Sequence, residues 1–468
     1  MMFSMQELPD VANFKRFLRT DHGATAFLAD QSIGPVTLTR APGRLDVMGG
    51  VADYSGSLVA EMTIAEAALV ALSPRADRTL RVWSRGIDAE GHTPQVSVSL
   101  DDFYSPGGSL LSYDAVQTLL RSDPQTRWAA YMFGCVFTLL AEGIVPSFTR
   151  GANILLDSRV PLGAGVSSSA AIEVATMQAL NAAFGLHLDG VTVARLSQMV
   201  ENKVVGAPCG IMDQMTSALG VENSLLLILC QPHEVLGTQA LPEGVQVYGI
   251  NSNVKHSVGG TAYTRARVAA FMGRKILGVD IGRELPYLTH FSTMRYEIAD
   301  QSHTLPETMT GTAFLETFGE TGDPVTQVDP AIQYPVKAST EHAIFENLGV
   351  NRFVKALARG ESEATTLSYA GQMMYFSHDS YTRIGLGCPE TDTLVELGRT
   401  AGPDKGIYGA KITGGGSGGT VAFLTYGDRA AQAISEVAAA YQAQTGLTPQ
   451  IFTGGQSPGA MAFGSETL

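Results

Sequence analysis

A short glycine- and serine-rich segment restricts the fold of this chain more than any other feature. Residues 161–171 read Pro-Leu-Gly-Ala-Gly-Val-Ser-Ser-Ser-Ala-Ala and separate a predicted strand (151–160) from a predicted helix (171–184). Glycines let the backbone approach a ligand closely, serines can cap the helix, and free N–H groups at the helix start suit a phosphate. The spacing fits neither a Walker A loop nor a Rossmann fingerprint. A simple glycine-rich turn with a serine cap is the alternative.

The organisation of the chain predicts an α+β protein of two lobes, since 468 residues are too many for one hydrophobic core. Apolar residues make up 45% and charged residues 16%, as in globular domains. Apolar alternation and β-branched runs predict strands at 36–50, 57–72, 78–86 and 94–103. Helices are predicted at 127–142, 341–357, 392–399 and 429–444. We place the lobe boundary near Asn251, which gives an N-terminal lobe of residues 1–250 and a C-terminal lobe of residues 251–468.

The charge pattern argues against nucleic acid or an anionic membrane as a partner. The net charge is −14, and no run of Lys or Arg is present. The longest apolar run, residues 225–230, predicts a buried strand and falls far short of a membrane span. The start lacks a signal-peptide pattern, and the four cysteines lie far apart without metal-finger spacing. We therefore expect a soluble cytoplasmic protein with reduced thiols.

Two further segments contain unusual residues for their surroundings. Residues 414–419 read Gly-Gly-Gly-Ser-Gly-Gly between apolar strands, and so many glycines predict close backbone packing against a ligand or another loop. Residues 40–54 contain Arg44 and Asp53 in a mostly apolar, strand-like context. Charged side chains in such an apolar segment are seldom buried unless they are paired or functional. Arg44 and Asp53 therefore either belong to a functional site or form a structural ion pair.

Together and in this order, the three segments resemble the signature motifs of the GHMP kinases (galacto-, homoserine, mevalonate and phosphomevalonate kinases). Further stretches are similar to the galactokinase branch: residues 209–214, residues 251–257 with Tyr263, and residues 377–378 with 388–392. The resemblance implies an N-terminal lobe like domain 2 of ribosomal protein S5 and a ferredoxin-like C-terminal lobe. The active site would lie between the lobes.

The resemblance also implies roles in phosphoryl transfer from ATP. Asp213 would take the proton of the anomeric hydroxyl, and Arg44 would keep that carboxylate ionised and offset charge on the γ-phosphate. Mg²⁺ would be held by Ser169, or by Ser168 beside it, together with Glu201. The nucleotide phosphates would contact a larger set of residues in the two glycine-rich loops: Pro161, Gly163, Ala164, Gly165, Ser167, Ser168, Ser169, Gly415 and Gly416.

Sugar hydroxyls would contact Asp53, Gly210 and Tyr263. Simpler interpretations exist for the individual residues, because Asp213 could cap a helix, Glu201 could be a solvated helix residue and Tyr263 could belong to the core. We assign no role to His256 or His378, which more often satisfy local hydrogen bonds.

The sequence departs from galactokinases at the position that meets the exocyclic 6-hydroxyl of galactose. Galactokinases read Gly-Glu-His-Thr-Asp-Tyr, whereas this chain reads Gly-Gly-Val-Ala-Asp-Tyr, with Gly50 and Val51 in place of the two polar residues. L-Arabinopyranose lacks that hydroxymethyl group, and a 6-hydroxyl against Val51 would lose about 1–3 kcal/mol by unpaired burial.

The same stretch resembles the L-arabinokinases of plants, so we predict L-arabinose + ATP → β-L-arabinose 1-phosphate + ADP. The alternatives are a galactokinase whose 6-hydroxyl is held by water or by residues 286–335, a uronic acid kinase with a cation from elsewhere, and a non-catalytic sugar and ATP sensor.

Overall fold

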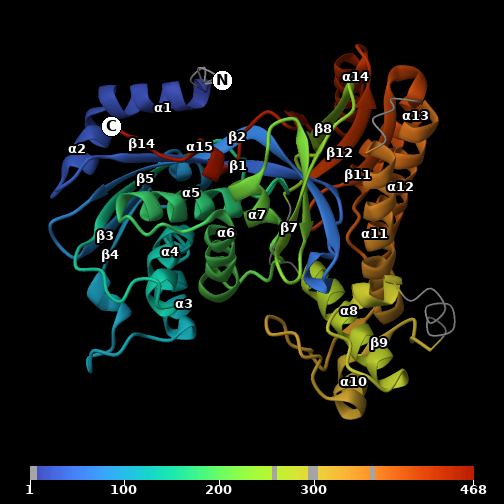
Figure 1. Cartoon of the computed structure of the whole chain (residues 1–468), viewed down its shortest axis with the longest axis horizontal. Helices are drawn as coiled ribbons and strands as arrows, with labels where there is room; N and C mark the ends of the chain where they lie inside the picture. The colour runs from blue at the N-terminus through green and yellow to red at the C-terminus, as the bar shows by residue number, and fades with distance from the viewer. Residues whose placement is uncertain (1–7, 256–260, 294–303, 359–363) are drawn as a thin grey trace.

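The computed structural model describes residues 8–255, 261–293, 304–358 and 364–468 of the chain. Two separate sheets organise these residues, each with helices packed against it (Figure 1). The first has the strand order β14-β1-β2-β5-β3-β4, with β6 paired to β2 and β7 paired to β6. Its strands are β1 Thr37–Met48, β2 Leu58–Pro74, β3 Thr79–Ser84, β4 Gln95–Ser99, β5 Ala152–Ser158, β6 Ser224–Leu229, β7 Glu234–Ala240 and β14 Glu466–Thr467.

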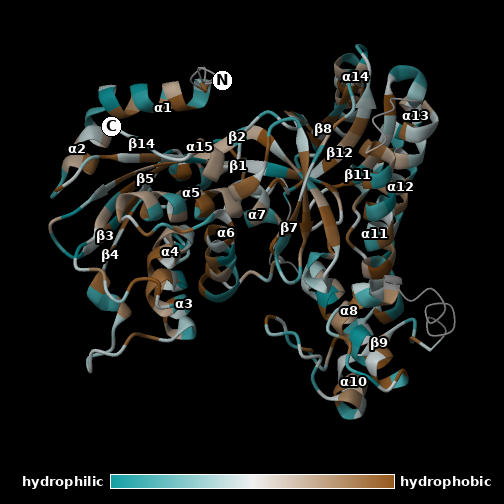
Figure 2. Cartoon of the chain, viewed as in Figure 1, coloured by the Kyte–Doolittle hydropathy of each residue, from teal (hydrophilic) through white to brown (hydrophobic). Residues whose placement is uncertain are grey.

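Helices cover both faces of the first sheet, which explains why its central strands are buried at nearly every position. On β2, Val70 and Leu72 face the large core beneath, whereas Leu69 and Ala71 face α1 and α2 on the other side. The upper helices are α1 Pro9–Thr20 and α2 His22–Ala29. Below lie α3 Tyr113–Arg121, α4 Ala130–Ala141, α5 Ser168–Ala183, α6 Gly190–Met199, a π-helical turn Val200–Val205 and α7 Met212–Leu219. Figure 2 shows hydrophobic residues along α4 and the strands, and hydrophilic residues on surface helices such as α1.

The second sheet is antiparallel, with the order β11-β12-β8-β13. Its strands are β8 Val245–Asn251, β11 Ile407–Ile412, β12 Thr420–Tyr426 and β13 Gln450–Thr453. The accompanying helices are α11 Val336–Leu357, α12 Ala364–Arg383, α13 Pro389–Ala401 and α14 Ala430–Thr445. Tyr441 and Phe423 are fully buried in the core between this sheet and its helices.

A smaller helical region projects below the second sheet (Figure 1). It contains α8 Thr261–Asp280, α10 Gly311–Phe318 and the short pair β9 Met309–Thr310 and β10 Gln333–Tyr334. The buried rings of Phe271, Phe291 and Phe314 hold this region against α11. Short 3₁₀ turns and the last helix complete the structure: Asp53–Ser55, Ile87–Glu90, Leu100–Phe103, Arg127–Ala129, Leu288–Thr293, Pro403–Lys405 and α15 Ala460–Phe463.

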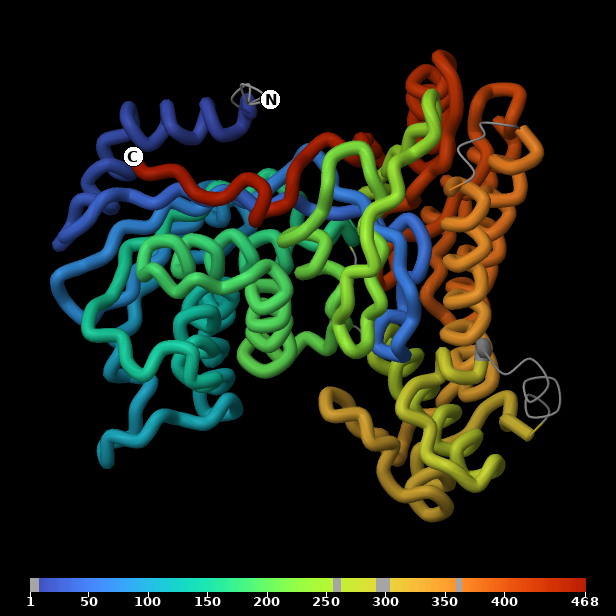
Figure 3. The backbone as a smooth tube through the Cα atoms, viewed as in Figure 1, coloured from blue at the N-terminus to red at the C-terminus, as the bar shows by residue number. Residues whose placement is uncertain are grey.

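The end of the chain returns to the first sheet, because β14 pairs with β1 beside the N-terminal helices (Figure 3). The strands and helices expected from apolar patterning are confirmed, with two differences in extent. The helix predicted at 341–357 begins five residues earlier, at Val336, and the strand predicted at 94–103 ends at Ser99, where a 3₁₀ turn follows. The patterning did not predict the remaining helices: α1, α2, α3, α6, α7, α8, α10, α12 and α15. The lobe boundary near Asn251 stays a prediction. Strand β8, which ends at Asn251, is part of the second sheet although it precedes that boundary. Within the described ranges, no helix is long and apolar enough to cross a bilayer.

Candidate active site

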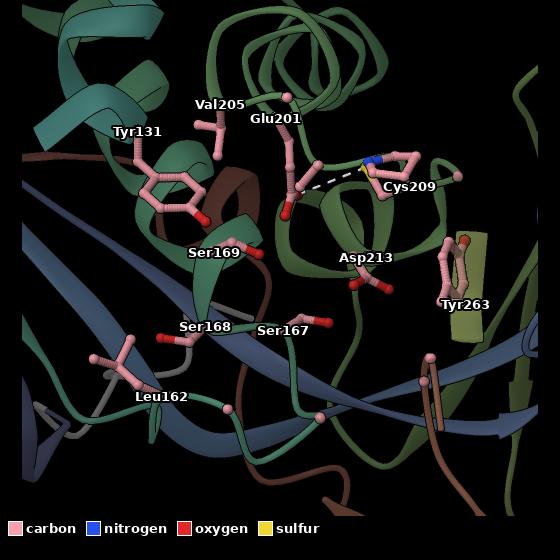
Figure 4. A pocket seen from close by; sticks show the side chains of 18 of the residues that line it. Tyr131, Leu162, Ser167, Ser168, Ser169, Glu201, Val205, Cys209, Asp213 and Tyr263 are labelled. Atoms are coloured by element: carbon pink, nitrogen blue, oxygen red, sulfur yellow. Dashed lines mark hydrogen bonds between the residues drawn. The ribbon is translucent and has the colours of Figure 1, made fainter. Parts of the chain in front are cut away.

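A cavity of about 470 Å³ lies where β1, the start of α5, α7 and α8 meet the second glycine-rich loop. It brings together residues that are far apart in the sequence (Figure 4). The predicted site residues that line it are Arg44, Val51, Asp53, Pro161, Gly163, Gly165, Ser167, Ser168, Ser169, Glu201, Gly210, Asp213, Tyr263 and Gly415. Three predicted residues lie outside the lining: Gly50, Ala164 and Gly416.

The start of α5 faces the cavity without a capping side chain. Ser167 occupies the N-cap position at φ 61° and makes no capping hydrogen bond, while the Ser168 hydroxyl donates to the Val160 carbonyl at 3.1 Å. The serine cap considered from the sequence is therefore not formed. Because the first N–H groups of a helix have no partner within the helix, this end suits an anionic group.

The two glycine-rich loops pack directly against each other. The Thr420 hydroxyl donates to the Ala164 carbonyl at 2.8 Å, and a Cβ at Gly419 would lie 2.8 Å from the same oxygen. A Cβ at Gly414 would lie 3.1 Å from the Gly165 carbonyl and 3.0 Å from Arg44 Nη2. Glycines at these positions thus allow the second loop to support the first, and Ala164 contributes a backbone contact instead of lining the cavity.

Arg44 and Asp213 form an ion pair at the centre of the cavity. Nε and Nη2 of Arg44 both donate to Asp213 Oδ1, at 3.0 and 2.7 Å, and Nη1 donates to the Gly165 carbonyl at 2.8 Å. The Arg44 side chain is 3% exposed and that of Asp213 is 21% exposed. Burial by itself lowers the pKa of Arg44, but the carboxylates of Asp213 and Glu61 raise it, so the guanidinium stays charged.

Glu201 lies on the π-helical turn and points toward Ser169 (Figure 4). Burial raises the pKa of Glu201 to about 7, and the hydrogen bond with Ser169 opposes that rise. The Gln214 side-chain amide donates to Glu201 Oε2 at 2.7 Å and to Glu173 Oε2 at 3.2 Å. Burial also raises the pKa of Glu173 well above its usual value. Oxygen donors therefore surround the start of α5.

Asp53 and Gly210 meet at the far end of the cavity. A Cβ at Gly210 would lie 1.5 Å from Asp53 Oδ2, so only glycine allows this approach. Burial, and then the charge of Asp213, raise the pKa of Asp53 to about 6. Tyr263 lies beside them with its ring edge-on to Tyr54, at 6.3 Å between ring centres. Asp53 is not paired with Arg44, so the structural ion pair considered for these two residues is not formed.

Val51 and Gly50 behave differently although they are neighbours. Val51 is buried, lines the cavity and has φ 58°, a strained value for a β-branched residue. Gly50 turns toward the protein interior, where a Cβ would lie 1.9 Å from Tyr381 Oη and 2.1 Å from Asp46 Oδ2. The Gly50 carbonyl accepts a hydrogen bond from His342 Nε2 at 3.0 Å. Sugar contact by Gly50 stays a prediction, whereas its geometry accounts for the absence of a side chain.

Several buried charged or polar residues near the site were not assigned a role from the sequence. Lys411 Nζ pairs with Asp46 Oδ2 at 2.7 Å, and both side chains are 0% exposed. Arg267 pairs with Asp323 at 2.8 Å. Glu61, Glu173 and Gln214 complete the set. The available signal was a charged residue within an apolar strand or helix, as at Lys411 and Glu173, but it does not identify the partner.

The predicted histidines have separate outcomes. His378 Nε2 lies 3.1 Å from Asp392 Oδ1, away from the cavity, as expected for a residue without a catalytic role. His256 and Ser257 of the quoted stretch lie outside the described residues. Within the described ranges, no group of three or more His, Cys, Asp or Glu side chains could hold a metal ion by itself.

Comparisons with known proteins find similarity in both sequence and fold. Residues 131–221 match the family described as GHMP kinases N terminal domain, and residues 353–443 match GHMP kinases C terminal. An L-arabinokinase from Arabidopsis thaliana is 40% identical over 92% of this chain, which spans 46% of that longer protein. A galactokinase from Chloroflexus aggregans is 31% identical over 89% of this chain and 90% of its own length. The structure of Lactococcus lactis galactokinase complexed with galactose superposes with a TM-score of 0.71 at 20% identity, covering 98% of this chain and 99% of that chain.

Proposed function

Because the chain belongs to the GHMP kinase family, we propose that it is an ATP-dependent sugar 1-kinase whose substrate is L-arabinose. The observation that carries this proposal is the Arg44–Asp213 ion pair beside the uncapped start of α5, all in one cavity. A cation, a partly exposed carboxylate and a helix N-terminus are the groups that phosphoryl transfer to a hydroxyl requires.

Asp213 receives the proton of the anomeric hydroxyl. Both hydrogen bonds from Arg44 go to Oδ1, so Oδ2 is the oxygen that can accept the sugar proton. As that proton moves to Oδ2, the sugar O1 forms a bond to the γ-phosphorus. The bond from the γ-phosphorus to the bridging oxygen breaks, and ADP leaves with those electrons. Arg44 offsets the charge on the transferred group.

The phosphates of ATP bind at the start of α5 and at the glycine-rich loop before it. Ser167, Ser168 and Ser169 supply hydroxyls and the first N–H groups of the helix, and Gly163 and Gly165 allow the backbone to approach. Gly415 and Pro161 also line the cavity. Ala164 and Gly416 lie outside the lining and pack against neighbouring backbone, Ala164 against Thr420 and Gly416 against Leu386.

The residues near Glu201 fit Mg²⁺. The Ser169 hydroxyl and the buried Glu201 carboxylate are hard oxygen donors that contact each other in the cavity. With only two ligands from the protein, Mg²⁺ would have further positions for water molecules and for phosphate oxygens of the substrate, as is usual in kinases. When bound, the ion would neutralise phosphate charge. Gln214 orients Glu201 by donating to Oε2.

The sugar is held between Asp53, Gly210 and Tyr263, with Val51 at the place where galactose carries its hydroxymethyl group. An apolar Val51 offers no hydrogen bond to a 6-hydroxyl, and L-arabinose has none. Tyr381 and Asp46 fill the space that a side chain at Gly50 would need, so Gly50 supplies no polar side chain either.

We also propose a cytoplasmic location for the protein and a lobe boundary near residue 250.

The test is ADP release by the purified protein with Mg²⁺-ATP and a panel of sugars. We expect kcat/KM for L-arabinose to exceed that for D-galactose by roughly ten- to a hundredfold, the equivalent of one unpaired buried hydroxyl. Equal or better use of D-galactose would make the protein a galactokinase, the alternative that its 31% identical relative supports. ATP binding without turnover of any sugar would indicate a sensor.

A further inference from the structure

A buried ion pair lies directly behind the sugar end of the cavity. Nε and Nη2 of Arg267, on α8, donate to Oδ2 and Oδ1 of Asp323 at 2.8 and 2.9 Å. The two side chains are 4% and 0% exposed. The Thr326 hydroxyl and the Val325 N–H also donate to Asp323, at 2.5 and 3.2 Å. The guanidinium is thus fixed in one orientation by a bidentate contact.

The third nitrogen of this guanidinium reaches the catalytic segment. Arg267 Nη1 donates to the Cys209 carbonyl at 3.3 Å, and Cys209 directly precedes Gly210. The rings of Tyr54 and Phe271 lie 5.1 and 5.5 Å from the guanidinium and enclose it. One side chain therefore connects α8 to the turn that contacts Asp53.

Arg267 is also the cation that acts most strongly on Asp53. Burial and the charge of Asp213 raise the pKa of Asp53, and the positive charge of Arg267 lowers it. The other titratable groups that face Asp53 come from several elements: Asp46, Tyr54, Cys209, Cys230, Tyr263 and Tyr381. Among these, Asp46 opposes ionisation of Asp53, and the thiols and phenols are neutral near pH 7 because burial raises their pKa.

We propose that Arg267, held by Asp323, is a positioning residue of the sugar site: it orders the turn at Cys209 and Gly210 and keeps the Asp53 carboxylate ionised to accept sugar hydroxyls. The inference rests on the proposed sugar kinase function. It assigns a role to Asp323, which lies 110 positions after Asp213, is not among the residues that line the cavity, and is bonded to Arg267.

Three variants separate the charge of Arg267 from its hydrogen bonds. The double variant Arg267→Met with Asp323→Asn removes both charges, so that no unpaired buried charge remains to unfold the protein. Arg267→Lys keeps the charge and loses the planar fork. Arg274→Met is the matched control, because Arg274 lies on the same helix, 4.8 Å from the same Phe271 ring, and donates to Thr321 and Pro286 carbonyls away from the cavity.

The first readout is the pH dependence of kcat/KM for L-arabinose between pH 5 and 9. Asp53 must be ionised, so kcat/KM falls as pH drops through its pKa. We expect the double variant to move this acidic limb to higher pH, losing roughly fivefold more activity at pH 6 than at pH 8.5. Arg267→Lys and Arg274→Met should keep the limb within about 0.3 pH unit of the unmodified protein.

The second readout needs no substrate. Hydrogen exchange of residues 206–211, measured by mass spectrometry, should be faster in the double variant and in Arg267→Lys than in Arg274→Met. A folded double variant with an unmoved acidic limb and unchanged exchange would overturn the proposal. If the unmodified protein phosphorylates no sugar, the proposed function fails, and exchange alone then decides whether Arg267 orders the turn.

Discussion

At the scale of single residues, the contact between Gly210 and Asp53 is the most restrictive in the site. A Cβ at Gly210 would lie 1.5 Å from Asp53 Oδ2, so Gly210→Ala must displace that carboxylate. We expect kcat/KM for the sugar to fall by at least about a hundredfold, mainly through KM, because a misplaced polar group loses its hydrogen bonds to the sugar. Steady-state kinetics measures this directly.

The control for that substitution is Gly107→Ala, where the nearest atom to a new Cβ is Ser105 Oγ at 3.8 Å. ATP binding, followed by calorimetry, should be the same in both variants. A Gly210→Ala protein with normal KM for the sugar would remove Asp53 from the sugar site.

Val51 offers a test of specificity at one residue. Its φ of 58° is unfavourable for valine but tolerated by asparagine, so Val51→Asn relieves backbone strain and adds a polar group to the cavity. We expect the ratio of kcat/KM for D-galactose to that for L-arabinose to rise roughly tenfold, because the amide can pair with a 6-hydroxyl. An unchanged ratio would show that Val51 does not face the C5 substituent of the sugar.

At the scale of elements, β1 and β11 are joined by the buried pair Asp46–Lys411. Both side chains are 0% exposed, and Asp46 also accepts a hydrogen bond from the Gly414 N–H at 3.2 Å. Lys411→Met leaves Asp46 buried without its counter-charge, and we expect a loss of about 3–5 kcal/mol in the free energy of unfolding. Urea denaturation measures the loss.

The matched control is Lys405→Met on the same lobe. Lys405 pairs with Glu436, and both of those side chains are about half exposed, at 58% and 46%. A pair exposed to that extent contributes little, so we expect a much smaller loss than from Lys411→Met. Equal losses from the two substitutions would contradict the account of the buried pair.

Apolar patterning predicted those strands and helices whose apolar residues follow a regular spacing within the segment itself. Strands β1 to β5 and helices α5, α11, α13 and α14 follow from alternation or helical spacing of apolar residues. The π-helical turn with Glu201 was not predicted. Its valines, Val200, Val204 and Val205, have helical spacing, but that spacing does not reveal the wider π-helical turn, which packs against α4. Helix α7, which contains Asp213, was also not predicted, because it is only eight residues long.

At the scale of the whole molecule, the site depends on pairs that are remote in sequence. Asp46 and Lys411 are 365 positions apart, and Arg44 and Asp213 are 169 apart. Composition shows that such charges exist but not which of them meet. The resemblance to the GHMP kinases supplied Arg44, Glu201 and Asp213, of which only Arg44 lies in the three glycine-rich or charged motifs. The structure added Glu61, Gln214 and Arg267 around them.

Glu346 connects the stability of the molecule to pH. Its Oε1 accepts hydrogen bonds from the Gly49 N–H at 2.9 Å and the Ser377 hydroxyl at 2.8 Å, and burial raises the pKa of Glu346 to about 7. The folded protein therefore binds this proton more tightly than the unfolded chain. Its contribution to stability is complete below the ordinary pKa of 4.5 and is lost as pH rises through about 7.

Glu346→Gln keeps both acceptor contacts and cannot ionise. We expect its free energy of unfolding, relative to the unmodified protein, to increase by about 2 kcal/mol between pH 5 and 8.5. Other titrating groups, including the buried histidines, are common to both proteins and cancel in the difference. A difference that does not change with pH would contradict a raised pKa at Glu346.

The product formed from L-arabinose and Mg²⁺-ATP, identified by ³¹P and ¹³C NMR, decides whether the protein is a sugar 1-kinase. We expect phosphate on the anomeric oxygen, with one ADP per sugar phosphate. We also expect Asp213→Asn, which keeps an oxygen for Arg44, to slow formation of this product by about 10²–10⁴-fold while still binding ATP. Phosphate on any other hydroxyl, or an Asp213→Asn protein with near-normal kcat, would contradict the proposed reaction.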